Sequence, residues 1–350
     1  MIVEMRRGAT QEQVDAVVER ARSYGCEVQL NIGTDKVVAA ILGSDTGSLS
    51  TDMFAVLPGV QSVTRVMVPY KLASHEFKPG PTVVHIGGAA IGGPHLVVMA
   101  GPCSIESHEQ LLSTARHVRR VGATVLRGGA FKPRTSPFSF QGMGLEAVRL
   151  LDVVRQETGL PVVSEITSPS LLDAMVEHVD ALQIGTRNMQ NYALLSAVGQ
   201  SGKPCILKRG LAATVTEWLQ AADYLLATGN DQVILCERGI RTFETSTRFT
   251  LDIASVGVVK RASHLPVIVD PSHAAGHYAL VPTLARAAVA AGADGLLIEV
   301  HPDPVNALSD GLQSLTFSDF ERLMGEIGAL AAVMQRPLAP VAVEEGPAGD

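Results

Sequence analysis

Aromatic side chains and cysteines are scarce in this chain of 350 residues. Aromatic residues make up 4% of it, Trp218 is the one tryptophan, and the formal net charge is −7. A nucleic-acid-binding surface needs a basic field and stacking rings, so this composition argues against one. The four cysteines (Cys26, Cys103, Cys205 and Cys236) are scattered without CxxC spacing. That pattern argues for reduced thiols rather than a disulfide framework.

Long uncharged apolar runs are also missing. The longest apolar stretches, such as residues 284–291, are broken by charge, so we expect no membrane span. The first residues, MIVEMRRG, are too polar for a signal peptide and already look like a strand. We therefore expect a cytoplasmic protein.

What the chain does contain is a series of eight short apolar runs, each followed closely by a polar or reactive side chain. Helix-length amphipathic segments separate the runs, which are 96–100, 124–126, 162–164, 181–184, 206–207, 233–235, 267–269 and 296–298. Parallel strands buried on both faces are nearly all apolar, so this α/β alternation predicts a (β/α)8 (TIM) barrel. In such barrels the active site lies at the carboxyl ends of the strands.

The barrel is expected to occupy residues 82–334, with an N-terminal hairpin (83–86 and 89–91) closing its bottom. Its helices are expected to begin near residues 108, 142, 169, 191, 214, 245, 281 and 318. Residues 335–350 are rich in Pro, Gly and Glu, which is typical of a flexible tail.

Residues 1–68 predict a separate ferredoxin-like (βαββαβ) module. Its expected strands are 2–5, 28–32, 37–42 and 60–68, and its expected helices are 49–57 and a segment that Thr10 caps and that ends at residue 24. Residues 69–81 form a linker to the barrel. We expect an effector-binding, regulatory domain, with an oligomerisation unit as the alternative.

The segment 126–137, LRGGAFKPRTSP, places cations and hydroxyls in a loop that prolines stiffen. Guanidinium groups match phosphate and carboxylate oxygens with two hydrogen bonds, and hydroxyls add donors. The loop therefore predicts an anion-binding site made by Arg127, Lys132, Arg134, Thr135 and Ser136.

Three further cations, Arg187, Lys208 and Arg238, follow the fourth, fifth and sixth runs. Because the ends of neighbouring strands share one mouth of the barrel, they predict a second anion site there. An ion pair of one of these cations with Glu165 or Glu237 is the alternative.

Cys103, His273, Glu299 and Asp310 follow the first, seventh and eighth runs, which are neighbours in a closed barrel. A thiolate, an imidazole and two carboxylates suit a divalent transition metal. The donor set leaves the ion open among Mn2+, Fe2+, Co2+ and Zn2+.

Several ordered motifs together resemble one family over nearly the whole chain. The motifs are AGPCSIES (100–107), LRGGAFKPRTSPFSFQG (126–142), QIGTRNMQN (183–191), LKRG (207–210), ILCERGIRTFE (234–244), VDPSHAAG (269–276) and IEVHPDP (298–304). The family is 3-deoxy-D-arabino-heptulosonate 7-phosphate (DAHP) synthase, in the type I beta subtype with an N-terminal ferredoxin-like regulatory domain. It is a transferase that makes the first intermediate of the shikimate pathway to aromatic amino acids.

The resemblance implies a reaction in which phosphoenolpyruvate condenses with erythrose 4-phosphate and water, and phosphate is released. It implies that the metal ligands are Cys103, His273, Glu299 and Asp310, and we expect them to bind Mn2+, with Fe2+, Co2+, Zn2+ or Cd2+ as alternatives. Lys132 would protonate the aldehyde oxygen, and Glu165 would orient or activate the water.

The resemblance also divides the predicted anion ligands among the substrates. The phosphate of phosphoenolpyruvate would be held by Arg187 and Arg238. Its carboxylate would be held by Arg127, Lys132 and Lys208. The sugar phosphate would be held by Arg134, Thr135 and Ser136.

Regulation is open, because Gln29 stands where the resemblance leads us to expect a histidine. The resemblance implies a homotetramer with an aromatic amino acid as the effector of the small domain. The effector could be Tyr, Phe or Trp, or there could be none.

Three alternatives compete with this interpretation. The sister synthase of 3-deoxy-octulosonate 8-phosphate uses arabinose 5-phosphate, but it carries Asn in its loop where this chain has Pro133. A Schiff-base aldolase would use Lys208 as its nucleophile. A non-catalytic amino-acid sensor would not need intact site residues.

Overall fold

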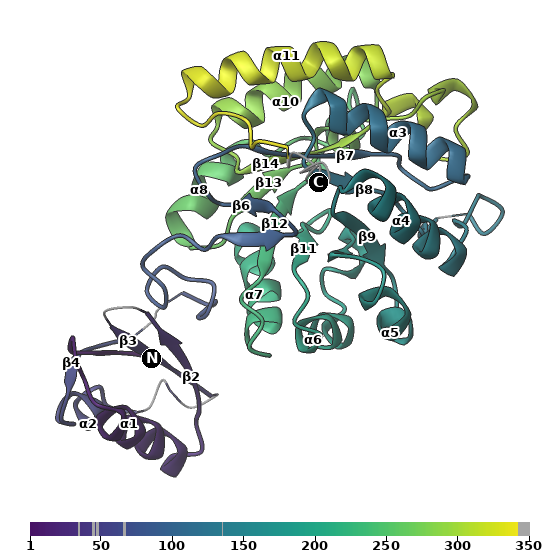
Figure 1. Ribbon diagram of the computed structural model, residues 1–350. Coiled ribbons are helices and arrows are strands. Elements are labelled where there is room, and N and C mark those ends of the chain that lie inside the picture. The colour runs from purple at the N-terminus through teal and green to yellow at the C-terminus, as the bar shows by residue number, and fades with distance from the viewer. Residues whose placement is uncertain (34–35, 44–45, 47–48, 66–67, 135, 342–350) are drawn as a thin grey trace, which may run out of the picture. The chain divides into compact units, whose positions relative to one another are not determined.

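The computed structural model describes residues 1–341 except 34–35, 44–45, 47–48, 66–67 and 135 (Figure 1). The chain forms two compact units. The first consists of Met1–Pro81 with Ala262–His264, and the second of Thr82–Arg261 with the chain from Leu265 onward.

The first unit contains an antiparallel four-stranded sheet in the order β2-β3-β1-β4. Its elements are β1 (Ile2–Met5), α1 (Gln11–Ser23), β2 (Glu27–Ile32), β3 (Val37–Leu42), α2 (Asp52–Ala55) and β4 (Val60–Thr64). This order confirms the predicted ferredoxin-like fold. Both α2 and β4 are shorter than the segments 49–57 and 60–68 that the sequence predicts.

Local sequence accounts for the start of α1. The Thr10 hydroxyl accepts a hydrogen bond from the backbone N–H of Gln13, whose side-chain oxygen accepts one from the Thr10 N–H. This capping box satisfies two N–H groups that the helix itself cannot pair. Val14, Val17 and Ala21 recur on one face of α1 and are buried, which places that face in the core of the unit.

The second unit is a closed barrel of eight parallel strands, as predicted. The strands are β7 (Val97–Gly101), β8 (Val125–Arg127), β9 (Val162–Ile166), β10 (Ala181–Ile184), β11 (Cys205–Lys208), β12 (Val233–Glu237), β13 (Val267–Val269) and β14 (Gly295–Glu299). They follow one another around the barrel in chain order, and β14 pairs with β7 to close it.

Helices lie outside the barrel strands (Figure 1). They are α3 (His108–Val121), α4 (Leu145–Thr158), α5 (Leu172–Val176), α6 (Tyr192–Gln200), α7 (Val215–Leu226), α8 (Ala254–Ala262), α10 (Val281–Ala290) and α11 (Phe317–Val333). A short helix, α9 (Pro271–Ala275), follows β13 directly. Single 3-10 turns are η1 (Pro169–Leu171), η2 (Thr186–Asn188), η3 (Tyr278–Leu280), η4 (Pro304–Asn306) and η5 (Gly311–Gln313).

A hairpin precedes the barrel, and its apolar side chains join the barrel core. Strands β5 (Val84–Ile86) and β6 (Ala89–Ile91) pair antiparallel. Their buried residues share one apolar cluster with residues that begin barrel strands, such as Val97, Val125 and Ala181. This apolar core therefore leaves the opposite, carboxyl ends of the strands to polar side chains.

The predicted helix start near residue 245 is wrong, because α8 begins at Ala254. The Glu244 carboxylate accepts hydrogen bonds at 2.7 Å from the backbone N–H groups of Thr245 and Ser246, which holds a turn there. Beyond it, Ile240 and Thr250 form an antiparallel bridge. Residues 238–253 are thus a long loop between β12 and α8, and this loop carries Arg248 to the site described below.

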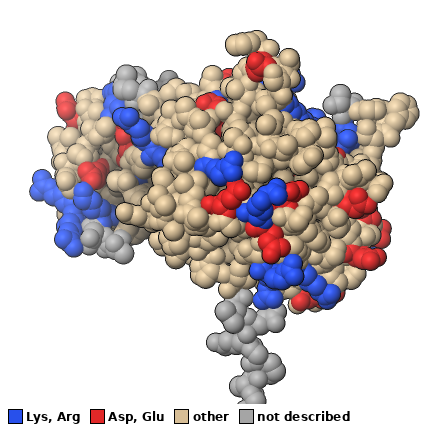
Figure 2. All heavy atoms as spheres, turned by 90° about the horizontal axis from the view of Figure 1, so that it is seen from above, with Lys and Arg blue, Asp and Glu red and all other residues tan. Residues whose placement is uncertain are grey.

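Figure 2 shows basic and acidic side chains in scattered groups, some of them next to one another, on a face that is mostly uncharged. Such a distribution is unlike the continuous basic field that a nucleic-acid surface needs. All four cysteines are free and buried, in agreement with the prediction of reduced thiols. Among the described residues, no helix combines the length and the hydropathy that a transmembrane segment requires.

Candidate active site

The predicted site residues gather at the carboxyl ends of the barrel strands. Arg127, Lys208, Glu237 and Glu299 are the last residues of β8, β11, β12 and β14, and Glu165 is the penultimate residue of β9. The strand hydrogen bonds thus extend slightly beyond the apolar runs. The first four side chains are buried, so their charges must be satisfied by one another or by a ligand.

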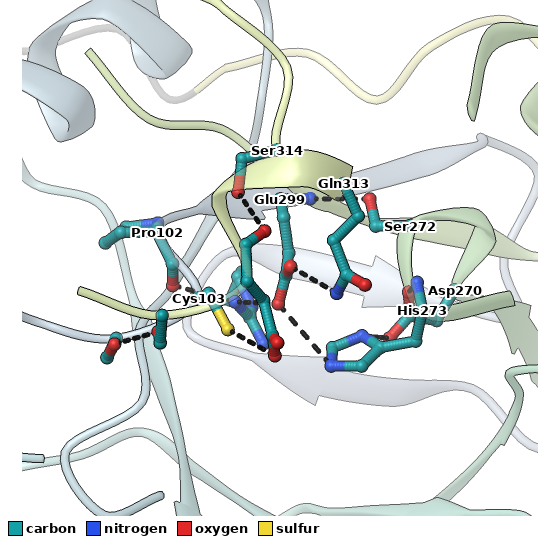
Figure 3. A network of polar contacts seen from close by, with 12 residues as sticks. Pro102, Cys103, Asp270, Ser272, His273, Glu299, Gln313 and Ser314 are labelled. Atoms are coloured by element: carbon teal, nitrogen blue, oxygen red, sulfur yellow. Dashed lines mark hydrogen bonds and ion pairs between the residues drawn. The ribbon is translucent and has the colours of Figure 1, made fainter. Parts of the chain in front are cut away.

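Cys103, His273 and Glu299 converge at the rim of the barrel (Figure 3). One ligand atom from each lies within 4.8 Å of the other two. Asp310 joins them, because its Oδ2 lies 3.3 Å from Cys103 Sγ. One sulfur, one nitrogen and one carboxylate oxygen at this spacing, with a second carboxylate beside the sulfur, suit a transition-metal ion, whose bonds to such atoms are about 2.0–2.3 Å long. The structure therefore gathers three of the predicted ligands in one cluster and places the fourth, Asp310, in contact with Cys103.

Asp270 holds the imidazole of His273 in place. Its Oδ1 accepts a hydrogen bond from the His273 backbone N–H at 2.9 Å, and its Oδ2 lies 2.7 Å from His273 Nδ1. Since an ionised carboxylate can only accept, Nδ1 carries the proton and Nε2 presents its lone pair toward Glu299, 3.5 Å from Oε1. Burial lowers the pKa of His273 to about 4, against the opposing charge of Asp270. The ring is therefore neutral near pH 7, as a metal ligand must be.

Glu299 is ionised and bonded through both oxygens. Arg127 Nη1 donates to Oε1 at 3.0 Å, and Gln313 Nε2 donates to Oε2 at 2.6 Å. Burial disfavours the charge, but His273, Arg127 and Lys132 outweigh it and lower the pKa of Glu299 to about 2.

Cys103 lies in the turn after β7 and faces a cation. Lys132 Nζ is 2.8 Å from its Sγ. Burial and the charge of Glu299 raise the pKa of the Cys103 thiol to about 12, against the attraction of Lys132. The isolated side chain is thus a thiol, and it must lose a proton to become a metal ligand.

Asp310 has an uncommon backbone conformation, with φ at +48°. Few residues other than glycine adopt this left-handed region, and such residues are frequent in functional sites. Burial disfavours the Asp310 carboxylate, yet nearby Lys132 and Arg248 lower its pKa. It is thus a second ionised carboxylate near the cluster, beside that of Glu299.

Beside this cluster opens a cavity of about 280 Å3 with a cationic wall. Its basic lining residues are Lys132, Arg134, Arg187, Lys208, Arg238 and Arg248. Ser136 lines the same cavity, whereas Thr135 lies outside the described residues. All predicted basic residues except Arg127 thus face one cavity. Arg127 instead lines a smaller adjoining space near Cys103.

Lys208 and Arg238 differ in whether a carboxylate balances their charge. Lys208 Nζ forms an ion pair with Asp270 Oδ2 at 2.5 Å. Arg238 is also buried, but its Nε has no hydrogen-bond partner among the residues that the structure describes. Burial lowers the pKa of Arg238, although a guanidinium stays charged in proteins. A buried guanidinium with an unmet N–H is suited to an incoming anion.

Glu237 does not pair with Arg238, the strand-end cation next to it. Its Oε2 instead accepts from Arg209 Nη1 at 2.9 Å, and Arg209 also binds Asp252 Oδ2 at 2.8 Å. Lys208 and Arg209 are sequence neighbours at the end of β11, and neighbours on a strand face opposite sides. Lys208 therefore faces the cavity, and Arg209 supports the outer layer.

Glu165 lies at the edge of a small internal space. Gln183 Nε2 donates to its Oε2 at 3.2 Å, and the two residues line a space of about 20 Å3 together with Arg127 and Lys132. That volume is enough for a single water molecule. A β-carbon at Gly185 would overlap the Glu165 carboxylate, so glycine is what leaves room for this side chain.

Sequence reasoning assigned no role to Asp270, Gln313 and Arg248. Asp270 follows β13 and stands two residues before Ser272 in the motif VDPSH, so its position was a usable signal. Gln313 and Arg248 lie in loops far apart in the sequence, so only the folded structure shows that they lie next to the cluster.

Comparison with known proteins agrees with this geometry. Residues 76–335 match the model of the DAHP synthetase I family, and residues 1–68 match the DAHP synthase ferredoxin-like domain. The chain belongs to the DAHP synthetase I family. This membership confirms the resemblance that the motifs predict.

Similar members of this family and related proteins match most of the chain. Phospho-2-dehydro-3-deoxyheptonate aldolase of Thermotoga maritima is 46% identical over 95% of this chain and 98% of that protein. A crystal structure of DAHP synthase from the same organism has a TM-score of 0.77 at 45% identity and covers 97% of this chain and 99% of that one. The 2-dehydro-3-deoxyphosphooctonate aldolase of Syntrophotalea carbinolica is 36% identical over 73% of this chain and 98% of that protein.

Proposed function

We propose that this chain condenses phosphoenolpyruvate with erythrose 4-phosphate and water to give DAHP and phosphate. The observation that carries the proposal is the meeting of Cys103, His273, Glu299 and Asp310 beside one cationic cavity. A metal-binding cluster next to a wall of cations suits the joining of two anionic substrates at a carbonyl group.

The four clustered side chains would hold a divalent ion, Mn2+ in the first place, with Fe2+, Co2+, Zn2+ or Cd2+ as alternatives. The donor set supports this, since sulfur and imidazole select transition metals over Mg2+ or Ca2+. A bound ion would polarise the aldehyde carbonyl of the sugar as a Lewis acid.

The cations of the cavity would bind the two substrates. We assign the phosphate of phosphoenolpyruvate to Arg187 and Arg238. The buried Nε of Arg238 has no hydrogen-bond partner among the described residues and could donate to it. Its carboxylate falls to Arg127, Lys132 and Lys208. The sugar phosphate falls to Arg134 and Ser136 with Thr135.

The enol C3 of phosphoenolpyruvate would attack the sugar aldehyde, water would add at C2, and phosphate would leave by C–O cleavage. Lys132 would protonate the aldehyde oxygen as the C–C bond forms. Burial opposes its charge, but Cys103 and Glu299 raise the pKa of Lys132, so it holds a proton to give. Glu165, held by Gln183 beside a water-sized space, would orient the water.

Product formation should be assayed with erythrose 4-phosphate and, in parallel, arabinose 5-phosphate. We expect turnover with the four-carbon sugar, loss of turnover in EDTA, and recovery with Mn2+. A preference for arabinose 5-phosphate would instead assign the sister activity. A Schiff-base aldolase acting through Lys208 would give a different result. EDTA would leave its turnover unchanged, and borohydride would link the substrate covalently to the enzyme.

The small domain would regulate the barrel in a homotetramer. In our proposal residues 1–68 bind an aromatic amino acid, 69–81 join them to the catalytic residues 82–334, and 335–350 form a tail. Deleting residues 1–70 should leave an active enzyme that Tyr, Phe and Trp no longer inhibit. A full-length protein that is equally insensitive would rule this out. A cytoplasmic location stays a prediction.

A further inference from the structure

The loop between β12 and α8 is fixed to the short helix that carries His273. The backbone N–H groups of Arg248 and Phe249 donate to the carbonyl oxygens of Ala275 and Ala274, at 3.2 and 3.0 Å. A β-carbon at Gly276 would overlap Cβ of Arg248. Glycine at that position, where φ is +70°, lets the two segments approach. Arg248 therefore projects from a point whose distance to α9 is set by the backbone.

From that point, the Arg248 side chain reaches two residues on the loop after β14. Its Nη1 donates to Gln313 Oε1 at 2.7 Å and lies 3.6 Å from Asp310 Oδ1. The side chain is 39% exposed and lines the cationic cavity. Arg248 thus bridges the segment of His273 and the segment of Asp310.

Gln313 relays this contact to a second carboxylate. It is buried, and its Nε2 donates to Glu299 Oε2 at 2.6 Å. An arginine can only donate and an ionised carboxylate can only accept, so the amide has one workable orientation. With Oε2 held by Gln313, Oε1 of Glu299 is the oxygen directed at His273 (Figure 3).

We propose that Arg248 is a positioning residue for the carboxylate ligands of the metal site, acting on Asp310 directly and on Glu299 through Gln313. The inference rests on the proposed metal-dependent function. Loss of an outer partner of a metal ligand typically weakens metal binding about 10–100-fold. Arg248 supports two of the four ligands, and Asp310 has a backbone conformation that needs support from its surroundings.

The test measures Co2+ binding to the full-length, metal-free protein, with affinity and the thiolate-to-cobalt absorption band as readouts. Arg248→Met and Gln313→Leu should each weaken affinity about tenfold or more and alter the cobalt spectrum. Their effects should not add in the double variant, because the two residues act in one chain of contacts. Arg248→Lys should recover part of the affinity, because it keeps the charge beside Asp310 but lacks the planar fork.

Arg241→Gln is the matched control, since it removes an exposed arginine from the same loop and should bind Co2+ as the unmodified protein does. Thermal unfolding without metal verifies that each variant is folded. Unchanged affinity and spectrum in Arg248→Met would overturn the inference and leave the metal site standing. A wild-type protein without the thiolate-to-cobalt band would remove the metal site itself, and the inference with it.

Discussion

Asp270 Oδ2 lies between two nitrogen atoms, 2.7 Å from His273 Nδ1 and 2.5 Å from Lys208 Nζ. One carboxylate therefore orients a proposed metal ligand and balances a proposed substrate-binding cation. Burial disfavours its charge, but His273 and Lys208 hold the pKa of Asp270 well below its usual range. Asp270 is thus one direct link between the candidate metal cluster and the anion cavity.

Asp270→Asn should damage both sites. The unpaired, buried Lys208 should lower the free energy of unfolding by about 3–5 kcal/mol, and loss of the partner of His273 should weaken metal affinity about 10–100-fold. Asn caps helices as well as Asp does, so the start of α9 is kept. Denaturant unfolding of the metal-free protein and Co2+ titration measure the two effects, and a variant as stable as the wild type would contradict the buried-pair argument.

Gly185→Ala should impair catalysis without impairing metal binding. The new methyl group would overlap the Glu165 carboxylate and displace it from Gln183. If Glu165 handles the water, kcat should fall about 100-fold or more, with Co2+ affinity unchanged. Gly257→Ala, which adds a methyl group in open space on α8, is the control. An unimpaired kcat in Gly185→Ala would remove Glu165 from the mechanism.

Arg209→Met should reduce stability but spare substrate binding. It breaks two contacts of a buried cation, with Glu237 and Asp252, and should cost about 3–5 kcal/mol of unfolding free energy. At a temperature where the variant is folded, KM for phosphoenolpyruvate should stay within about twofold. Lys208→Met should instead raise that KM. If the two variants changed KM equally, the assignment of Lys208 to the cavity and of Arg209 to the outer layer would be wrong.

Metal affinity should rise with pH. Burial and Glu299 raise the pKa of the Cys103 thiol to about 12, so a proton must leave when sulfur binds the ion. His273, with a pKa of about 4, and Glu299, with a pKa of about 2, have already lost theirs at neutral pH. One released proton gives about a tenfold gain in affinity per pH unit between about pH 6 and 9. Calorimetry in buffers of different ionisation enthalpy counts the protons; a count of zero would exclude Cys103 as a ligand.

The barrel and most of its site were readable from the sequence, for a physical reason. Strands buried on both faces leave uninterrupted apolar runs, and parallel strands bring their carboxyl ends to one rim. The positions of Cys103, His273 and Glu299 at that rim follow directly. The predicted helix start near residue 245 was wrong, because backbone N–H groups there donate to the Glu244 carboxylate in a turn and α8 begins only at Ala254.

Other features depend on contacts between segments that are distant in the sequence, and hydrophobic periodicity does not predict such contacts. Gln313 and Arg248 are 65 positions apart and meet only because their loops cross at the barrel mouth. Glu237 pairs with Arg209 and not with Arg238. Arg238 is its sequence neighbour, and the side chains of neighbouring strand residues face opposite sides. Such pairings become visible only once strand register is known.

Arg127 donates to Glu299, and Lys132 contacts Cys103, so the basic groups assigned to the enol carboxylate already contact the ligands assigned to the ion. In the proposed roles, a bound divalent cation would compensate the charge of these ligands and leave Arg127 and Lys132 free to bind the carboxylate. It follows from the proposed roles that loading is sequential: the inorganic ion first, the three-carbon donor next. Without the ion, the donor should find its carboxylate partners already engaged.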